Sequence, residues 1–487
     1  MNFTAGLRPL RLSFTAMDKP RSYTKAISDI SLAPCKYVLL VSVLGVFFGI
    51  DFGFVISNHN VLISFYSLKE GDINVIVGSF LLGVLLGIFL GGMVVYTSGR
   101  KICMLGGVAF GLAALFSSAL APNFSLLLLA QVVVGFSFAI YLLATSLYVN
   151  EITASSNRGF CVIMVWVFLT AGVMLSTFIH WVKPMDSSFV YFVVFGAVIL
   201  FATVISFFYL PESPRWLSFS GYPDAALSTL FKLRKDMGIA ARELADINES
   251  CSVEDSGMEF FLQNANYRRP IWLMLVMGVL LHLGGIIFVP YAILDLIDTG
   301  FRTYPIYAVY KDGTVHQALV TSIFAGAVSA ACLTDRMGRS NAMFYSAMLA
   351  LMALLVLFGI SMYDTGKITS GIILGIIIVY SFASVFFLCV LLPLVANEIL
   401  PMKGREFGFC VILFANVVLI LFGFRSYNYI IDALGYSGYY LLCVLSFACL
   451  LYIVRRFVPN TVNNSLEGIQ TRLLSGISLR DLGKAAR

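Results

Sequence analysis

Residues 150–158 read NEITASSNR, and residues 397–405 read NEILPMKGR. In both stretches a glutamate precedes an arginine by seven residues (Glu151 and Arg158, Glu398 and Arg405). The two copies lie 247 residues apart. A match of this kind between distant parts of one chain suggests an internal repeat.

Two further pairs of motifs repeat at almost the same distance. Gly99-Arg100 recurs as Gly338-Arg339, 239 residues later, and Pro211-Glu212 has a counterpart in Pro459-Asn460, 248 residues later. Chance could supply one such match, but three in register predict a duplicated unit.

The composition places this duplicated unit in a membrane. The chain of 487 residues is 59% hydrophobic and only 12% charged, whereas a soluble domain carries about 25% charged residues. Long apolar runs in lipid must be helices, because every backbone polar group has to be satisfied internally. Twelve runs are long enough to span: 38–57, 73–97, 102–120, 125–149, 160–182, 189–209, 270–294, 315–333, 342–362, 370–396, 407–427 and 436–457.

The longest polar interruption, 211–269, divides these runs six and six. We therefore predict an all-α membrane protein with twelve transmembrane helices in two pseudo-symmetric six-helix bundles. The predicted divisions are an N-terminal tail (1–37), a first bundle (38–210), a central loop with short surface helices and a disordered stretch near 251–258 (211–269), a second bundle (270–457) and a C-terminal tail (458–487).

Basic residues set the predicted orientation. With the N-terminus in the cytoplasm, only six of the 32 Lys and Arg residues fall on the outer side: Lys69, Lys183, Arg302, Lys311, Lys367 and Arg425. Lys and Arg concentrate in cytoplasmic segments of membrane proteins. Both termini and the central loop are therefore predicted to be cytoplasmic, in a bacterial inner membrane or a plasma membrane.

Several other classes of protein are disfavoured. The net charge of +6 is too small and scattered to suggest nucleic acid, and the nine cysteines form no CxxC motif or Cys/His cluster. We see no Walker loop, nucleophile motif or metal cluster, so neither an enzyme nor a cofactor is expected. The polar, basic first 36 residues lack the apolar core of a signal peptide and are interpreted as a retained tail.

Charged residues gather at the predicted cytoplasmic ends of the helices, at matched positions in the two halves. Acidic residues contribute little to topology, so repeated glutamates need another reason, and ion pairs between the halves would supply one. Such pairs would hold one state of a rocking transporter closed as a cytoplasmic latch. The latch candidates are Arg100, Glu151, Arg158, Glu212, Arg215, Asp335, Arg336, Arg339, Glu398 and Arg405.

Four motifs resemble those of the sugar porter family of the major facilitator superfamily. Residues 211–217 read PESPRWL after the sixth span, and residues 335–339 read DRMGR, like the DRxGR loop of the superfamily. Residues 458–469 are similar to the PETKG…LEEI ending of the family, and residues 49–57 (GIDFGFVIS) to its first-helix pattern. The resemblance covers nearly the whole chain and implies a twelve-helix transporter of sugars or polyols, often coupled to protons.

The sequence departs from the family at several places. The first-half copy of the DRxGR loop reads YTSGR at residues 96–100, so its acid and first base are lost and this arm of the latch is expected to be weaker. Proton-coupled relatives usually have an arginine where this chain has Gln131. Sugar binders usually have a glutamine where it has Trp166, and a tryptophan where it has Pro393.

The seventh span carries further departures. The paired glutamines of the family fall on Leu281 and His282, and its asparagine falls on Ile287, whereas Gly285 and Tyr291 fit the pattern. Asn416 is a neutral polar residue within a span that could bond substrate or a neighbouring helix. The predicted substrate-binding residues are Gln131, Trp166, His282, Gly285, Tyr291, Pro393 and Asn416.

Asp51 is the most informative single residue. A charged carboxylate in the middle of an apolar span is costly, so an acid there can take up a proton near neutral pH. We predict that Asp51 couples transport to protons, with the proton as the coupling ion; the alternative is an acid that reaches the outer interface or pairs structurally. His282 is either a structural histidine or a residue that contacts substrate or relays protons.

These observations leave three functions open. The first is a secondary transporter that moves a sugar, a polyol or a similar small hydroxylated solute by alternating access, through proton-coupled symport. The second keeps the fold but carries an organic ion or a more apolar metabolite, or works as a facilitative uniporter. The third is a nutrient sensor. The expected partners are a small-molecule substrate and the lipid bilayer, and a monomer is the default for the fold.

Overall fold

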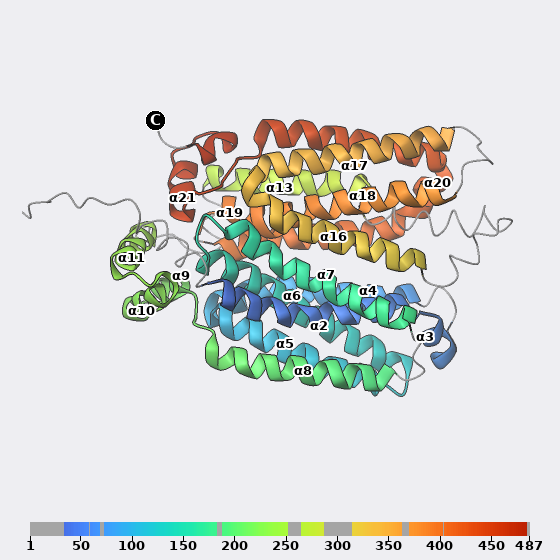
Figure 1. The fold of residues 1–487 in the computed structure, drawn as a ribbon, viewed down its shortest axis with the longest axis horizontal. Helices are drawn as coiled ribbons and strands as arrows, with labels where there is room; N and C mark the ends of the chain where they lie inside the picture. Colours follow the sequence, from blue (N-terminus) through green and yellow to red (C-terminus); the bar gives the residue numbers. More distant parts are fainter. Residues whose placement is uncertain are drawn as a thin grey trace, which may run out of the picture.

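The computed structural model describes residues 34–57, 59–68, 73–182, 188–251, 264–286, 314–362, 370–402 and 404–484, and regular structure there is helical throughout. Figure 1 shows two groups of long, roughly parallel helices, the earlier residues in one layer and the later residues in the other. We call these groups the first half and the second half.

The first half contains six long helices and one short one. Asn123 caps α6 by accepting a hydrogen bond from the amide of Leu126 at 2.9 Å, which satisfies one of the free donors at a helix start. The short helix α3 between the first two spans was not predicted. The elements are α2 (Cys35–Ser57), α3 (His59–Tyr66), α4 (Ile73–Ser98), α5 (Arg100–Ala119), α6 (Phe124–Ile152), α7 (Arg158–Val182) and α8 (Ser188–Tyr209).

The second half contains α13 (Ala265–Leu283), α16 (Thr314–Met337), α17 (Arg339–Met362), α18 (Ser370–Val390) and α20 (Arg405–Phe457). The α18 helix continues through a π-helical turn, η2 (Leu391–Val395), into α19 (Ala396–Ile399). Proline lacks an amide hydrogen, so Pro393 disturbs the regular ladder and accounts for the wide turn. The two predicted spans 407–427 and 436–457 share the label α20, but they are two helices that meet at a kink at Gly435, where φ is +67° and the backbone is not helical.

Ten stretches of helix in the described part of the chain are long and apolar enough to cross a membrane. The other two predicted spans correspond to α8, whose apolar stretch Val194–Tyr209 is shorter, and to α13. The predicted seventh span, 270–294, was too long as a helix: α13 ends at Leu283 and the chain turns at Gly285, where φ is +84°. Residues 287–294 lie outside the described residues.

Short helices gather at one end of the molecule, which we call the polar end (Figure 1). They are α9 (Pro214–Phe219), α10 (Pro223–Arg234), α11 (Met237–Cys251), α21 (Leu466–Leu474) and the 3₁₀ turn η3 (Leu479–Gly483). The first three come from the predicted central loop and the last two from the predicted C-terminal tail. Most of the stretch predicted to be disordered, 252–258, lies outside the described residues.

Glycines allow the helices of the first half to approach closely. A Cβ atom at Gly49 of α2 would lie 2.0 Å from the carbonyl oxygen of Leu169, and one at Gly172 of α7 would lie 2.2 Å from that of Val46. The backbones of α2 and α7 are therefore in direct contact, as small residues permit between membrane helices. This contact fixes α2, and with it Asp51, against α7.

We expect Gly49→Ala to destabilise the protein by about 1–3 kcal/mol, because the added methyl has no room and the helices must separate. Gly78→Ala in α4 is a matched control, since a Cβ there meets no atom within 4 Å. Thermal unfolding of the detergent-solubilised variants measures the difference. Equal melting temperatures for the two variants would contradict the close contact.

Candidate functional site: a buried ion-pair cluster and a central acid

Two arginines at the polar end occupy equivalent places in the two halves. Arg100 begins α5 and pairs with Glu151 at the end of α6, with nitrogen–oxygen distances of 3.1 and 3.2 Å. Arg339 begins α17 and pairs with Glu398 of α19 at 3.1 and 2.9 Å. All four side chains are buried. Each pair is bidentate, the geometry in which arginine and carboxylate bind most strongly.

The residues around these pairs repeat as well. Gly99 and Gly338 precede the arginines with φ values of +88° and +85°, a conformation that favours glycine. Glu212 accepts the backbone amides of Arg100 and Lys101, each at 3.1 Å. At the equivalent place, Asn460 accepts the amide of Arg339 at 3.2 Å. A polar side chain from the segment after the sixth or last span thus caps α5 and α17.

A hydroxyl completes each copy. Ser213 donates to Glu151, and Thr461 donates to Glu398 at 2.5 Å. Ser213 and Thr461 are 248 residues apart, the same offset as Glu212 and Asn460. Each buried glutamate therefore has both an arginine and a hydroxyl to compensate its burial.

Other contacts join the two halves. Arg158 of α7 lies 3.5 Å from Glu398 and donates to the carbonyl of Asn464 at 3.2 Å. Asp335 accepts the amides of Gly159 and Phe160, at the start of α7, at 3.0 and 2.7 Å. These contacts must break if the halves separate at this end. We refer to the two arginine–glutamate pairs and the residues that contact them as the polar cluster.

Three more links cross between the halves or between the helices attached to them. Arg100 forms an ion pair with Glu406, in the first turn of α20. Arg215 of α9 binds Glu467 of α21 at 2.8 Å. The Asn150 amide donates to the carbonyl of Pro393 at 3.3 Å. The polar end is therefore closed in this structure.

For charged groups outside the spans, burial and neighbouring opposite charges shift the pKa in opposite directions. Burial alone would raise the pKa of Glu467, but Arg215 outweighs it and the pKa is lowered. For Glu212 burial wins over the amides and Arg100, and its pKa is raised. Burial would lower the pKa of Arg215, yet the neighbouring carboxylates, Glu467 first, raise it. Glu467 and Arg215 are thus held charged, as a closed latch requires.

The predicted latch residues do not all join the cluster in the same way. Arg336 is exposed and forms no ion pair with the residues that the structure describes. Arg405 is buried, and among the described residues its guanidinium donates to the carbonyl of Leu400, at 3.3 and 3.1 Å, without forming an ion pair. The others lie within the cluster: Arg100, Glu151, Arg158, Glu212, Arg215, Asp335, Arg339 and Glu398.

Five members of the cluster were missed from the sequence: Ser213, Glu406, Asn460, Thr461 and Glu467. The internal repeat could have found Thr461 and Ser213, and Asn460 had been matched to Glu212 without a role. No repeated position signals Glu406, whose equivalent in the first half is Gly159.

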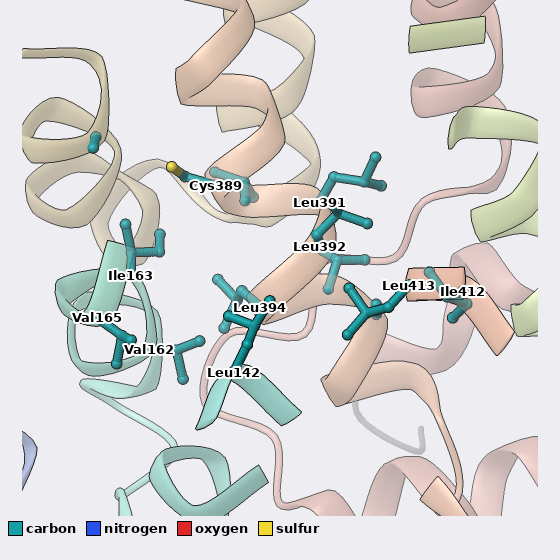
Figure 2. Close-up of a cluster of buried hydrophobic side chains, with 14 of the residues drawn as sticks. Leu142, Val162, Ile163, Val165, Cys389, Leu391, Leu392, Leu394, Ile412 and Leu413 are labelled. Carbon is teal, nitrogen blue, oxygen red and sulfur yellow. The ribbon is translucent and has the colours of Figure 1, made fainter. Parts of the chain in front are cut away.

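Buried apolar side chains from the two halves form a layer where the halves face each other (Figure 2). Leu142 of α6 and Val162 of α7 face Leu394 of η2, and all three are buried. Pro393, predicted to bind substrate, lies in the same π-helical turn and uses its carbonyl in the contact with Asn150.

Asp51 lies in the middle of α2 and is 2% exposed. Within the part of the chain that the structure describes, the Gln131 amide of α6 donates to Asp51 Oδ1 at 3.4 Å. Phe52 packs on Phe80 and Phe138 nearby, with ring centroids 4.6 and 5.7 Å apart. The carboxylate therefore has a neutral partner and apolar surroundings, which favour its protonated form.

The structure also brings together two candidates in the second half. The Asn416 amide of α20 lies against Gly278 of α13, where an added Cβ would be 3.3 Å from Asn416 Oδ1. One turn further along α13, His282 Nδ1 lies 2.8 Å from the Gly278 carbonyl. Asn416 Oδ1 is buried and has no hydrogen-bond partner among the described residues, so it is available to a ligand or a water molecule.

The remaining substrate-binding candidates are less well defined. The Trp166 indole N–H in α7 is buried without a hydrogen-bond partner in the described part of the chain. Gly285 turns the chain after α13. Tyr291 lies outside the described residues. The roles of all seven substrate-binding candidates stay predictions, as does that of Asp51. No group of three or more described His, Cys, Asp or Glu side chains could hold a metal ion.

Two helical halves joined by breakable ion pairs define a transporter with the major facilitator fold. A model of the family described as "Sugar (and other) transporter" matches residues 37–473. The chain belongs to this family. It is a multi-pass membrane transporter of the sugar porter type and not an enzyme.

The chain resembles curated sugar transporters over almost its whole length. It is 26% identical to the galactose-proton symporter of Escherichia coli, over 91% of this chain and 95% of the relative. It is 27% identical to the arabinose-proton symporter of the same species, over 91% of this chain and 94% of the relative.

Solved structures show the same fold. The proton:xylose symporter XylE bound to 6-bromo-6-deoxy-D-glucose matches with a TM-score of 0.73 at 16% identity, covering 90% of this chain and 98% of XylE. The inward-open xylose transporter XylE from E. coli matches with a TM-score of 0.62 at 17% identity, covering 88% and 97%.

Proposed function

We propose that this protein is a proton-coupled symporter of a sugar, a polyol or a similar small hydroxylated solute. It would work by alternating access, with the substrate bound between the halves near the middle of the membrane. The polar end would face the cytoplasm, as would both termini, in a bacterial inner membrane or a plasma membrane. The functional unit would be a monomer.

The observation that carries proton coupling is the environment of Asp51. This acid is buried within a span and bonded to the neutral amide of Gln131. A buried acid without a fixed cation exchanges its proton more readily than one that is held charged. The similarity to relatives named as galactose-proton and arabinose-proton symporters also favours proton coupling.

The polar cluster supplies the gate in this proposal. In the closed state the contacts across the halves, such as Arg158 with Glu398, hold the cytoplasmic end shut. Substrate and proton would bind from the opposite side. Opening toward the cytoplasm would separate the halves, expose the buried charges to water and release both.

The substrate site would lie between α2, α6, α7, α13 and α20. Asn416 and Gln131 would supply amide groups for hydroxyls, His282 a ring nitrogen, and Trp166 an apolar face and an N–H donor. Pro393, Gly285 and Tyr291 would shape the walls. A site with few amides and one indole suits a solute with fewer hydroxyls than a hexose.

A second candidate cargo is an organic ion or a more apolar metabolite. The observation in its favour is the apolar layer of Figure 2, together with Leu281, which is fully buried where the family carries a glutamine. A facilitative uniporter would differ by ignoring the proton gradient. A nutrient sensor would bind the solute without moving it.

Uptake by the purified protein in proteoliposomes tests the choice. With an inward proton gradient, we expect one member of a panel of hexoses, pentoses and inositols to accumulate, whereas without the gradient it should only equilibrate. A thermal-shift screen with the same panel plus organic acids and amines provides the parallel measurement. Stabilisation by ions alone, with no sugar or polyol transported, would favour the second cargo.

A further inference from the structure

The acid that joins the halves sits differently in the two copies of the polar cluster. In the second half, Asp335 at the end of α16 binds its own Arg339 at 2.7 Å. It also reaches across to the amides of Gly159 and Phe160 in the first half. This single acid therefore connects the arginine of one half to a helix start in the other.

The first half lacks that acid. The position equivalent to Asp335 is Tyr96, whose ring packs near Phe407 at a centroid distance of 6.0 Å. Phe407 of α20 is the equivalent of Phe160 of α7. Tyr96 therefore contacts the start of α20 at the position equivalent to that at which Asp335 contacts α7. The capping residue of α20, Gly404, offers no side-chain hydrogen bond to the helix start.

A carboxylate is nevertheless present in this copy, on the opposite side of the interface. Glu406 lies in the first turn of α20 and pairs with Arg100, the equivalent of Arg339. Both side chains are 3% exposed. An acid in the first turn also interacts favourably with the positive end of the helix dipole.

Steric fit explains why one copy cannot have both an acid in the loop and an acid at the start of the facing helix. A Cβ atom at Gly159 would lie 2.4 Å from Asp335 Oδ1, so a loop acid requires glycine at the start of the facing helix. Glu406 holds the position equivalent to Gly159. Because no acid stands at residue 96, the start of α20 has room for a side chain.

From this geometry we infer that Glu406 replaces the lost loop acid and forms the second closing link between the halves. Each of the repeated arginines Arg100 and Arg339 then keeps a connection to the other half through an acid, on the facing helix in one copy and in the loop in the other, in addition to the pairs Arg158–Glu398 and Arg215–Glu467. The first-half arm of the latch is then not weakened, contrary to what the loop alone predicts. This inference deepens the proposed alternating access, because both links must break for the polar end to open.

Hydrogen–deuterium exchange of the full-length protein in nanodiscs tests the inference without substrate or proton gradient. We expect Glu406→Gln to speed exchange of the amides at the starts of α5 and α20 by about tenfold or more, since one partner of a buried pair is lost. Asp481→Asn is the matched control, because its pair with Lys484 is exposed, and it should leave these amides unchanged.

The decisive variant moves the acid back to the loop. Tyr96→Asp combined with Glu406→Gly recreates the arrangement of Asp335 and Gly159, and should return exchange to within about twofold of the unmodified protein. Glu406→Gly alone should remain fast. If Glu406→Gln does not fold, the double variant must restore the folded yield.

Two results would overturn the inference: unchanged exchange in Glu406→Gln, or a double variant that exchanges as fast or folds as poorly as the single one. Hydrogen–deuterium exchange of these amides reports opening of the polar end and does not depend on which solute the protein carries. A protein that carries no sugar but shows the expected exchange pattern would therefore refute the proposed substrate and leave this inference standing.

Discussion

Asp51→Asn is expected to abolish proton-driven accumulation of substrate while substrate exchange across the membrane continues. Asparagine resembles the protonated acid in shape and in its lack of charge, and it can still bond to Gln131. It cannot release a proton. The variant should therefore cycle between its two states with substrate bound but gain no energy from the gradient.

The expected size of this effect follows from the driving force. A proton entering across 100 mV supplies about 2.3 kcal/mol, enough for roughly 50-fold accumulation of a neutral solute at one proton per substrate. In Asp51→Asn the accumulation ratio should fall to about one. Exchange of labelled for unlabelled substrate should remain within about threefold of the unmodified protein.

Asp432→Asn is the matched control for this experiment. Asp432 is an exposed acid in α20, far along the chain from Asp51, and its replacement should leave accumulation unchanged. Normal accumulation in Asp51→Asn would show that the proton is coupled through another group.

Glu398→Gln is expected to destabilise the protein by about 3–5 kcal/mol, the usual penalty for removing one partner of a buried ion pair. Glu398 is fully buried and compensates both Arg339 and Arg158. Glutamine keeps the volume but leaves the two guanidinium groups without a buried acid at this point. Thr461 would also lose a charged acceptor.

Thermal unfolding in detergent measures the loss, with Asp481→Asn again as the exposed comparison. The Glu398→Gln variant should melt well below the unmodified protein. The Asp481→Asn variant should melt at the same temperature as the unmodified protein. A Glu398→Gln protein that is as stable as Asp481→Asn would mean that this pair contributes nothing to the closed state.

The internal repeat singled out most of the charged residues that gather at the polar end, and it predicted ion pairs between the halves. Arg100 with Glu151 and Arg339 with Glu398 instead pair within one half, whereas Arg158 with Glu398 crosses between the halves as predicted. Glu406 could not be found this way, since its equivalent is Gly159 and the two copies solve the same problem with different residues. Only the distances across the interface show that Glu406 pairs with Arg100.

The ends of the helices were harder to predict. The apolar run of the seventh span continues past Leu283, and composition alone does not show that Gly285 adopts a positive φ and turns the chain. The sequence named Pro393 as a substrate-binding candidate and did not predict the π-helical turn η2 in which it lies.

For the central site, the sequence singled out Asp51 and Gln131 separately. The structure shows that Gln131 is the partner of Asp51, in the position where the family implies an arginine. Hydropathy cannot give such pairings, because they depend on the rotation of α2 against α6. The side chains that bind the cargo remain predictions for the same reason.

The pH outside proteoliposomes that contain no substrate at the start tests the central claim most directly. When the transported solute is added to vesicles that contain the unmodified protein, proton entry should make the external medium more alkaline. Asp51→Asn should take part in exchange without any such change. Entry of the solute with no external pH change in the unmodified protein would contradict proton-coupled symport.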